Sequence, residues 1–277
     1  MTDIKKDEKK KIIEILLERN IVSNEKEARA ILMAGKVRIG GKSVEKPGTI
    51  VNSGEPLEVT KKKSYVSRGG FKLEGAFEDF GINAGGKKAA DVGSSTGGFT
   101  DYLLKNGAEK VLCIDVGYGQ LSWKLRKSPR VIVFERTNIR NFDTKKFPYK
   151  SDITVLDLSF ISIKKVMGKV MDLTAAGGEI LLLVKPQFEL KKDEVEKGGV
   201  IKDIKLHFSA LMEVTEYIRR LPVIIKGFTY SKIKGAKGNI EFWIFLIKTD
   251  KAGKSATNYD KIIRDIVKKA HFYFNKS

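Results

Sequence analysis

The chain has 277 residues, 42% hydrophobic and 31% charged, a balance typical of a globular protein with a substantial core. Lysine and arginine outnumber aspartate and glutamate by 53 to 34, a net charge of +19, so nucleic acid is the first expected partner and an acidic membrane surface the second. No apolar run approaches the ~20 residues that span a bilayer, and the single cysteine, Cys113, excludes an internal disulfide and a cysteine-rich zinc site, so we expect a cytoplasmic protein without a metal.

The first 60 residues predict two helices followed by short strands and turns. Apolar residues at helical spacing indicate a helix over residues 5–20. Ser23 is the predicted N-cap of a second helix over residues 24–34, and Gly35 is its predicted C′ residue. The pattern resembles the S-four domain, a small RNA-binding module first seen in a ribosomal protein. The resemblance implies RNA contacts for the basic residues Lys26, Arg29, Lys36, Arg38 and Lys42, each of which is otherwise an ordinary solvent-facing charge.

Four segments are predicted in all. Residues 1–60 form the RNA-binding domain, residues 61–64 a short lysine-rich linker, residues 65–250 a large catalytic domain, and residues 251–277 a C-terminal helix. Strands and helices alternate from about residue 87 to 220, which predicts an α/β fold with a doubly wound sheet.

A glycine-rich loop follows the first strand of the large domain. A short apolar run leads into Asp91 and Val92, Gly93 follows, and a helix begins at Phe99. In the dinucleotide-binding fingerprint G-x-G-x-x-G the middle position is glycine, but here Ser95 occupies it. The phosphate-binding P-loop is also excluded, because no Gly-Lys-Ser/Thr follows. The pattern therefore favours a cofactor without a phosphate to hold, such as S-adenosylmethionine (SAM), with a plain strand-to-helix turn as the alternative. The predicted cofactor residues of this loop are Asp91, Gly93, Ser94, Gly97, Gly98 and Phe99.

Later strands are expected to end at the same edge of the sheet. Asp115, at the end of the strand 110–115, is placed to accept hydrogen bonds from a ribose diol, and Asn138 follows the third strand near the expected adenine. The fourth strand, from about residue 153 to 156, ends in Asp157. The fifth, 180–184, ends in Lys185, and the polar residues 187–205 after it are expected to be mobile.

Two further charged residues complete the candidate site. Lys72 lies early in a helix that ends near Phe80, and Glu241 lies near the start of the last strand, 239–247. Enzymes that transfer a methyl group to a base amine commonly have two prolines after the fourth strand, and Asp157-Leu-Ser-Phe160 lacks them. Enzymes that transfer it to a pyrimidine carbon commonly use a cysteine nucleophile, and Cys113 lies inside a strand. An oxygen acceptor remains, and on RNA this is the 2′-hydroxyl.

The large domain resembles the TlyA-type family of haemolysin-like rRNA 2′-O-methyltransferases. The resemblance rests on these stretches: Ser67-Arg-Gly-Gly-Phe-Lys-Leu73, Asp91-Val-Gly-Ser-Ser-Thr-Gly-Gly-Phe99, Glu135-Arg-Thr-Asn138, Leu156-Asp-Leu-Ser-Phe-Ile-Ser162, Leu183-Val-Lys-Pro-Gln-Phe188 and Gly238-Asn-Ile-Glu-Phe242. It implies SAM-dependent methylation of a cytidine ribose in ribosomal RNA, either free or in ribosomal subunits. It also implies a catalytic set, Lys72, Asp157, Lys185 and Glu241, and Arg68 is an expected RNA contact.

Two other functions are weighed against this one, a membrane-active haemolysin and an RNA-binding assembly factor without catalysis. The presence of all four residues of the catalytic set argues against the assembly factor. The sequence leaves open the oligomeric state, the modified nucleotide and the ribosomal subunit that carries it.

Overall fold

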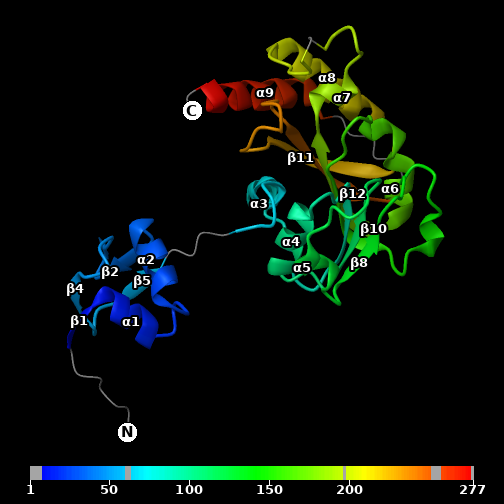
Figure 1. Ribbon diagram of the computed structural model, residues 1–277. Helices are drawn as coiled ribbons and strands as arrows, with labels where there is room; N and C mark the ends of the chain where they lie inside the picture. The colour runs from blue at the N-terminus through cyan, green and yellow to red at the C-terminus, as the bar shows by residue number, and fades with distance from the viewer. Residues whose placement is uncertain (1–7, 60–63, 196–197, 251–256, 276–277) are drawn as a thin grey trace. The chain divides into compact units, whose positions relative to one another are not determined.

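The chain divides into two compact units, Met1–Ser64 and Tyr65–Ser277. In this computed structural model, shown in Figure 1, the described residues are 8–59, 64–195, 198–250 and 257–275. The predicted linker residues 61–63 and the first residues of the predicted C-terminal segment, 251–256, lie outside them. Within the described residues, no helix is both long and apolar enough to cross a membrane.

The first unit packs two short helices on small antiparallel strands. Its elements are β1 (Lys9–Lys11), α1 (Ile12–Glu18), α2 (Glu25–Met33), β2 (Val37–Ile39), β3 (Lys42–Ser43), β4 (Ile50–Asn52) and β5 (Leu57–Val59). β1 pairs with β4, and the second sheet has the order β3-β2-β5. Apolar residues of both helices, among them Ile12, Leu16 and Leu32, pack against Val37 of β2 to form its core.

Two boundary predictions in this unit are wrong. The first helix begins at Ile12, because Lys9–Lys11 pairs as a strand with Ile50–Asn52. Residues 5–7 of the predicted helix lie outside the described part of the chain. The second helix is capped by Asn24, whose side-chain oxygen accepts a hydrogen bond from the Glu27 N–H at 3.0 Å, and Ser23 lies one residue too early. Gly35 has the predicted left-handed backbone, with φ +64°.

The second unit is a seven-stranded sheet covered on both faces. Its strands are β6 (Lys88–Val92), β7 (Lys110–Ile114), β8 (Val131–Phe134), β9 (Ser151–Leu156), β10 (Thr174–Val184), β11 (Val223–Tyr230) and β12 (Phe242–Lys248). They lie in the order β11-β12-β10-β9-β6-β7-β8. β6 to β10 run parallel, and β12 is antiparallel to both of its neighbours. The doubly wound sheet is therefore confirmed.

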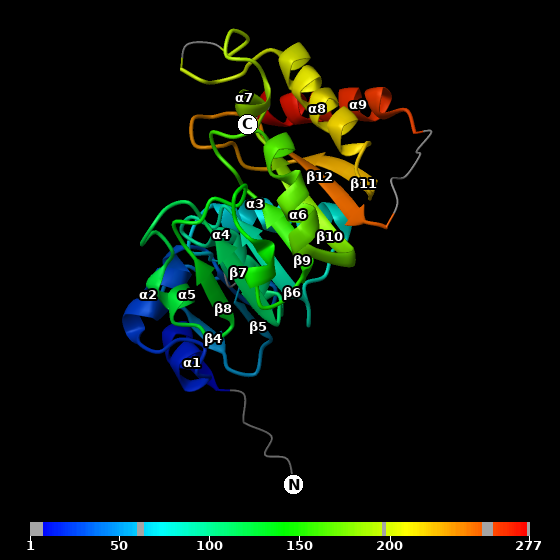
Figure 2. The same cartoon turned by 90° about the vertical axis from the view of Figure 1, so that its right-hand side faces the viewer.

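Helices cover the sheet in two layers. They are α3 (Gly69–Phe80), α4 (Gly98–Lys105), α5 (Trp123–Arg126), α6 (Met167–Leu173), α7 (Pro186–Glu189), α8 (Ile204–Ile218) and α9 (Tyr259–Asn275), with 3-10 turns η1 (Thr144–Lys146) and η2 (Ile163–Lys165). α3, α4 and α5 pack with one face of the sheet, and α6, α8 and α9 pack with the other. Figure 2 shows α8 and α9 beside one another over β11 and β12.

The alternation of side chains along the strands produces these two cores. In β10, Leu181 and Leu183 face the α3–α4 layer, whereas Leu182 and Val184 face the α6–α8 layer. β10 begins earlier than predicted, at Thr174, with irregular pairing to β9 before Glu179. The parallel strands end at one edge, where the loops that carry the candidate site meet.

Candidate functional site

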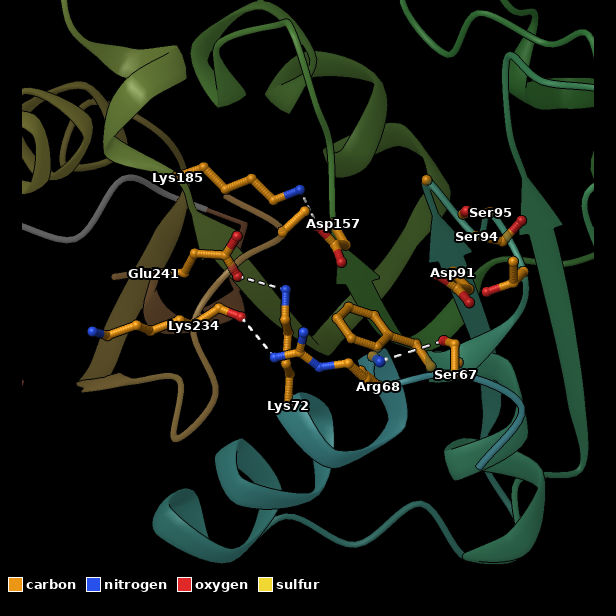
Figure 3. A pocket seen from close by; sticks show the side chains of 16 residues that line it. Ser67, Arg68, Lys72, Asp91, Ser94, Ser95, Asp157, Lys185, Lys234 and Glu241 are labelled. Atoms are coloured by element: carbon orange, nitrogen blue, oxygen red, sulfur yellow. Dashed lines mark hydrogen bonds and ion pairs between the residues drawn. The ribbon is translucent and has the colours of Figure 1, made fainter. Parts of the chain in front are cut away.

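Two adjoining pockets lie at the carboxyl edge of the parallel strands. The first has a volume of about 570 Å³ and the second about 530 Å³. Gly93, Ser95 and Asp157 line both, so the two form one continuous site at the end of β6 and β9. Figure 3 shows the first pocket, with charged side chains from α3, from the ends of β9 and β10 and from the loop before β12 pointing into it.

The glycine-rich loop is shaped by backbone conformations that few residues adopt. Gly93 has φ +89°, and a Cβ there would overlap the Asp157 backbone oxygen. Ser95 is also left-handed, with φ +46°, and its N–H donates to the Asp115 carboxylate at 2.8 Å. Gly97 lines neither pocket, and a Cβ there would overlap Leu125. Its φ of +92° and this packing explain the glycine.

Three other residues of the loop line the first pocket. Ser94 is buried, and Phe99 packs with its ring centroid 5.6 Å from that of Trp243. Gly98 begins α4, and a Cβ on it would overlap the Ser67 side chain at the start of α3. The missing side chain at Gly98 thus brings the helix that carries Lys72 against the loop.

Asp91 is fully buried and has one oxygen to spare. Its Oδ2 accepts hydrogen bonds from the Thr100 N–H at 3.0 Å and the Thr100 hydroxyl at 2.7 Å. Its Oδ1 has no hydrogen-bond partner among the described residues. Burial raises the pKa of Asp91 to about 7. An unpaired buried carboxylate oxygen is costly, so a cationic donor at this wall of the pocket fits the residue.

The second pocket contains the residues predicted to hold a nucleoside. Asp115 accepts hydrogen bonds from the backbone N–H groups of Ser95 and Gly117, at 2.8 and 2.7 Å. These contacts fix both carboxylate oxygens at the pocket wall and leave acceptor capacity for a ribose diol. Asn138 lines the same pocket, together with the apolar residues Ile139 and Leu158. A polar diol site beside apolar surface suits an adenosine group.

Lys185 and Asp157 form one ion pair of the first pocket. The Lys185 Nζ lies 2.5 Å from Asp157 Oδ1 and donates a hydrogen bond to the Ser159 hydroxyl at 3.0 Å. Lys185 is the last residue before α7, where Pro186 ends the strand. An ammonium group has three N–H donors. With Asp157 and Ser159 engaged, one donor direction is left for a substrate.

Lys72 and Glu241 form the second ion pair. The Lys72 Nζ lies 2.6 Å from Glu241 Oε2, and the side chains are 12% and 3% exposed. Burial raises the pKa of Glu241, and the Lys72 charge opposes that rise. Glu241 lies just before β12, not within it as predicted, at the end of a tight loop in which a Cβ on Gly235 would overlap its carboxylate.

The predicted RNA contacts divide between the two units. Lys26, Arg29, Arg38 and Lys42 are exposed, and Lys36 is half-buried, all in the first unit. Arg29 pairs with Glu25 at 3.3 Å. Arg68 is exposed in the second unit, where it lines the first pocket and donates to the Lys234 backbone oxygen at 3.2 Å.

The structure adds residues that the sequence did not single out. Ser159 bonds to Lys185, and Lys234 and Ala236 line the first pocket from the loop before Glu241. Phe160 lines the second pocket although it is 91% exposed and has φ +63°. The position of Ser159, two residues after Asp157 in a loop at a strand end, was the one signal that could have identified it.

Comparisons with known proteins agree with this geometry. The family model for FtsJ-like methyltransferases matches residues 65–248, and the S4 domain model matches residues 12–57. A protein of Mycobacterium tuberculosis called 16S/23S rRNA (cytidine-2′-O)-methyltransferase TlyA is 39% identical over 91% of this chain and 95% of its own length. Hemolysin A of Brachyspira hyodysenteriae is 40% identical over 78% of this chain and 90% of its own.

A solved structure agrees as well. A hemolysin-like protein from Streptococcus thermophilus is 34% identical, covers 97% of this chain and 98% of its own, and superposes with a TM-score of 0.73. The predicted fold class, a methyltransferase sheet preceded by a small RNA-binding domain, is confirmed.

Proposed function

We propose that this chain, which belongs to the FtsJ-like methyltransferase family and to its TlyA members, methylates the ribose 2′-hydroxyl of a cytidine in ribosomal RNA. One observation carries the proposal. Two lysine–carboxylate pairs, each with one buried member, meet in the pocket beside the glycine-rich loop: Lys72–Glu241 and Lys185–Asp157. The methyl transfer takes place in the cytoplasm, where the ribosomal RNA is found.

SAM is the proposed cofactor, and the residues present fit it. Asp91 offers a buried carboxylate oxygen to the cofactor's ammonium group, and Asp115 accepts from its ribose hydroxyls. Asn138 lines the second pocket and would hold the adenine. Gly93 lets the backbone pass close to the amino-acid end. When bound, SAM supplies an electrophilic methyl group. The protein's task is then to present the hydroxyl oxygen and to deal with its proton.

Lys185 is the residue that activates the 2′-hydroxyl. A hydroxyl is a weak nucleophile, and its oxygen gains reactivity when its proton is removed or its developing charge is stabilised. The Lys185 Nζ is held by Asp157 and Ser159, so its remaining N–H can donate to the attacking oxygen and stabilise the charge that develops there, while the hydroxyl proton passes to the neighbouring Asp157 carboxylate. Lys72 and Glu241 orient the ribose and balance the charge. Positioning of the reactants supplies much of the rate.

Basic residues of the first unit bind the RNA in this proposal. Replacing Arg38 and Lys42 of the β2–β3 hairpin by alanine should raise the KM for ribosomal subunits and leave the SAM dissociation constant unchanged. Each lost phosphate contact lowers the slope of log affinity against log salt by roughly 0.7–0.9. Lys46→Ala is the matched control, an exposed lysine of the same unit outside the predicted set. An unchanged KM in the double variant would count against the assignment.

The activity is tested by transfer of a labelled methyl group. Purified protein is incubated with methyl-labelled SAM and separated small and large ribosomal subunits from cells that lack the modification. The RNA is then digested to nucleosides. We expect the label in 2′-O-methylcytidine. Label on a base would contradict the proposal, as would no transfer by a protein that binds SAM.

A further inference from the structure

We propose that Glu189 is a positioning residue for the methyl transfer, because its buried carboxylate ties the segment that carries Lys185 to the loop that carries Asp157 and Ser159. The proposal rests on the function proposed above. Glu189 touches neither reacting group. It ends α7, the short helix that begins directly after Lys185.

Glu189 makes two hydrogen bonds to the end of the Asp157 loop. Its Oε2 accepts from the Ser162 hydroxyl at 2.6 Å, and its Oε1 accepts from the Ile163 N–H at 2.8 Å. Ser162 caps η2, the turn at which this loop ends. The Lys185–Asp157 pair and the Glu189–Ser162 pair therefore link the same two segments at two places.

In the loop between these two links, Leu158 and Ile161 pack against the core, and the Phe160 ring centroid lies 5.1 Å from that of Phe188. The polar residues Asp157 and Ser159 depend on hydrogen bonds and ion pairs for their positions. The loop is fixed at its start, where the Asp157 N–H donates to the Val92 backbone oxygen at 3.0 Å. In its middle, Phe160 is 91% exposed and has φ +63°, a backbone conformation that costs a bulky residue energy. Glu189 supplies the second fixed end. Without it, Asp157 and Ser159 would be held less firmly with respect to the Lys185 Nζ.

A merely structural role explains Glu189 less well. The residue is 6% exposed, and burial raises the pKa of its carboxyl. Apolar residues of similar volume often stabilise a fold as well as buried charges do, since they carry no desolvation cost. A carboxylate at this place matches the two donors of Ser162 and Ile163, and both donors lie at the end of the loop that carries Asp157 and Ser159.

The test compares Glu189→Ala with Glu189→Gln. The alanine variant should lower turnover at saturating SAM and RNA by roughly tenfold or more, because small displacements of reacting groups are expensive. Its SAM affinity should fall less than turnover, since Asp91 and Asp115 lie on β6 and after β7, and only one side of the second pocket, with Leu158 and Phe160, belongs to the loop. The glutamine variant should restore turnover to near the wild-type value, because its amide can accept from Ile163 N–H and donate to the Ser162 oxygen.

Two more variants keep the test decisive. Thr174→Val removes buried hydrogen bonds to Val170 and Thr154 at the far end of β10, and should leave turnover unchanged. If Glu189→Ala does not fold, Ser162→Ala should still lower turnover several-fold, and an unchanged value would overturn the proposal. So would full turnover in Glu189→Ala, loss in Glu189→Gln equal to that in Glu189→Ala, or a fall in SAM affinity that matches the fall in turnover.

The test also separates this inference from the proposed function. If the wild-type protein transfers no methyl group to either subunit, the proposed function fails. If the wild type is active and Glu189→Ala matches it, only the role of Glu189 fails.

Discussion

The Lys72 ammonium and the Glu241 carboxylate lie 2.6 Å apart although 169 positions separate them in the chain. Both side chains are nearly buried, so each is the main group that offsets the desolvation cost of the other's charge. The pair connects the helix α3 to the loop before β12, and both residues line the first pocket.

Glu241→Gln should therefore cost both activity and stability. The amide leaves the buried Lys72 charge without a counter-charge, and we expect methylation to fall by roughly 100-fold and the free energy of unfolding by about 1–3 kcal/mol. Methyl transfer and denaturant unfolding measure the two effects. In the double variant Lys72→Met/Glu241→Leu, stability should recover and methylation should not. Recovery of methylation would show that the pair is structural only.

The raised pKa of Asp91 predicts a pH dependence of SAM binding. A cationic ammonium group binds the ionised carboxylate, and Asp91 loses its charge as the pH falls through about 7. The SAM dissociation constant should therefore rise between pH 7.5 and pH 6 in calorimetric titrations. Asp91→Asn should weaken binding by roughly tenfold or more and remove most of the dependence. If the SAM dissociation constant of Asp91→Asn depends on pH as that of the wild type does, the pH dependence arises from the cofactor and not from Asp91.

The same pKa has a consequence for stability without cofactor. Because the folded-state pKa of Asp91 is raised above its usual value near 4, ionisation opposes folding. This destabilisation is absent below the unfolded pKa and complete above about pH 7. Asp91→Asn should therefore stabilise the cofactor-free protein at pH 8 and have little effect near pH 4.

Gly93→Ala should push the glycine-rich loop away from Asp157. The new Cβ would overlap the Asp157 backbone oxygen and would also strain a residue at φ +89°. We expect SAM affinity to fall by roughly tenfold or more, since such strain costs about 1–3 kcal/mol. Gly86→Ala is the control, because Gly86 also has a positive φ, +71°, but a Cβ there meets nothing within 4 Å. Equal losses in both variants would show that backbone strain alone is responsible.

The sequence was sufficient for the wound sheet because its strands are strongly apolar and end in polar residues. Parallel strands end at one edge, so the residue pattern alone places Asp91, Asp115, Asp157 and Lys185 together, and all four line the two pockets. Local boundaries were harder. The helical spacing of the apolar residues that follow includes Lys9–Lys11 in the predicted helix, and only the pairing with Ile50–Asn52 makes these residues a strand.

Contacts that do not follow from the shared edge of the parallel strands could not be predicted. His207 and His271 have no metal-ligand spacing, yet the fold of α8 on α9 brings His271 Nε2 to 3.0 Å from His207 Nδ1. Burial, with the neighbouring imidazole second, lowers the pKa of His207 to about 4. Glu189 was missed for a similar reason. Residues 187–205 are polar and were expected to be mobile, whereas the structure buries Glu189 against η2.

The role of Lys185 is the central claim, and single-turnover methyl transfer by Lys185→Ala tests it most directly. The SAM dissociation constant and the affinity for ribosomal subunits are measured on the same preparation. We predict a loss of transfer of roughly 100-fold or more, with both affinities close to wild type. Full transfer by Lys185→Ala with unchanged SAM binding would contradict the account.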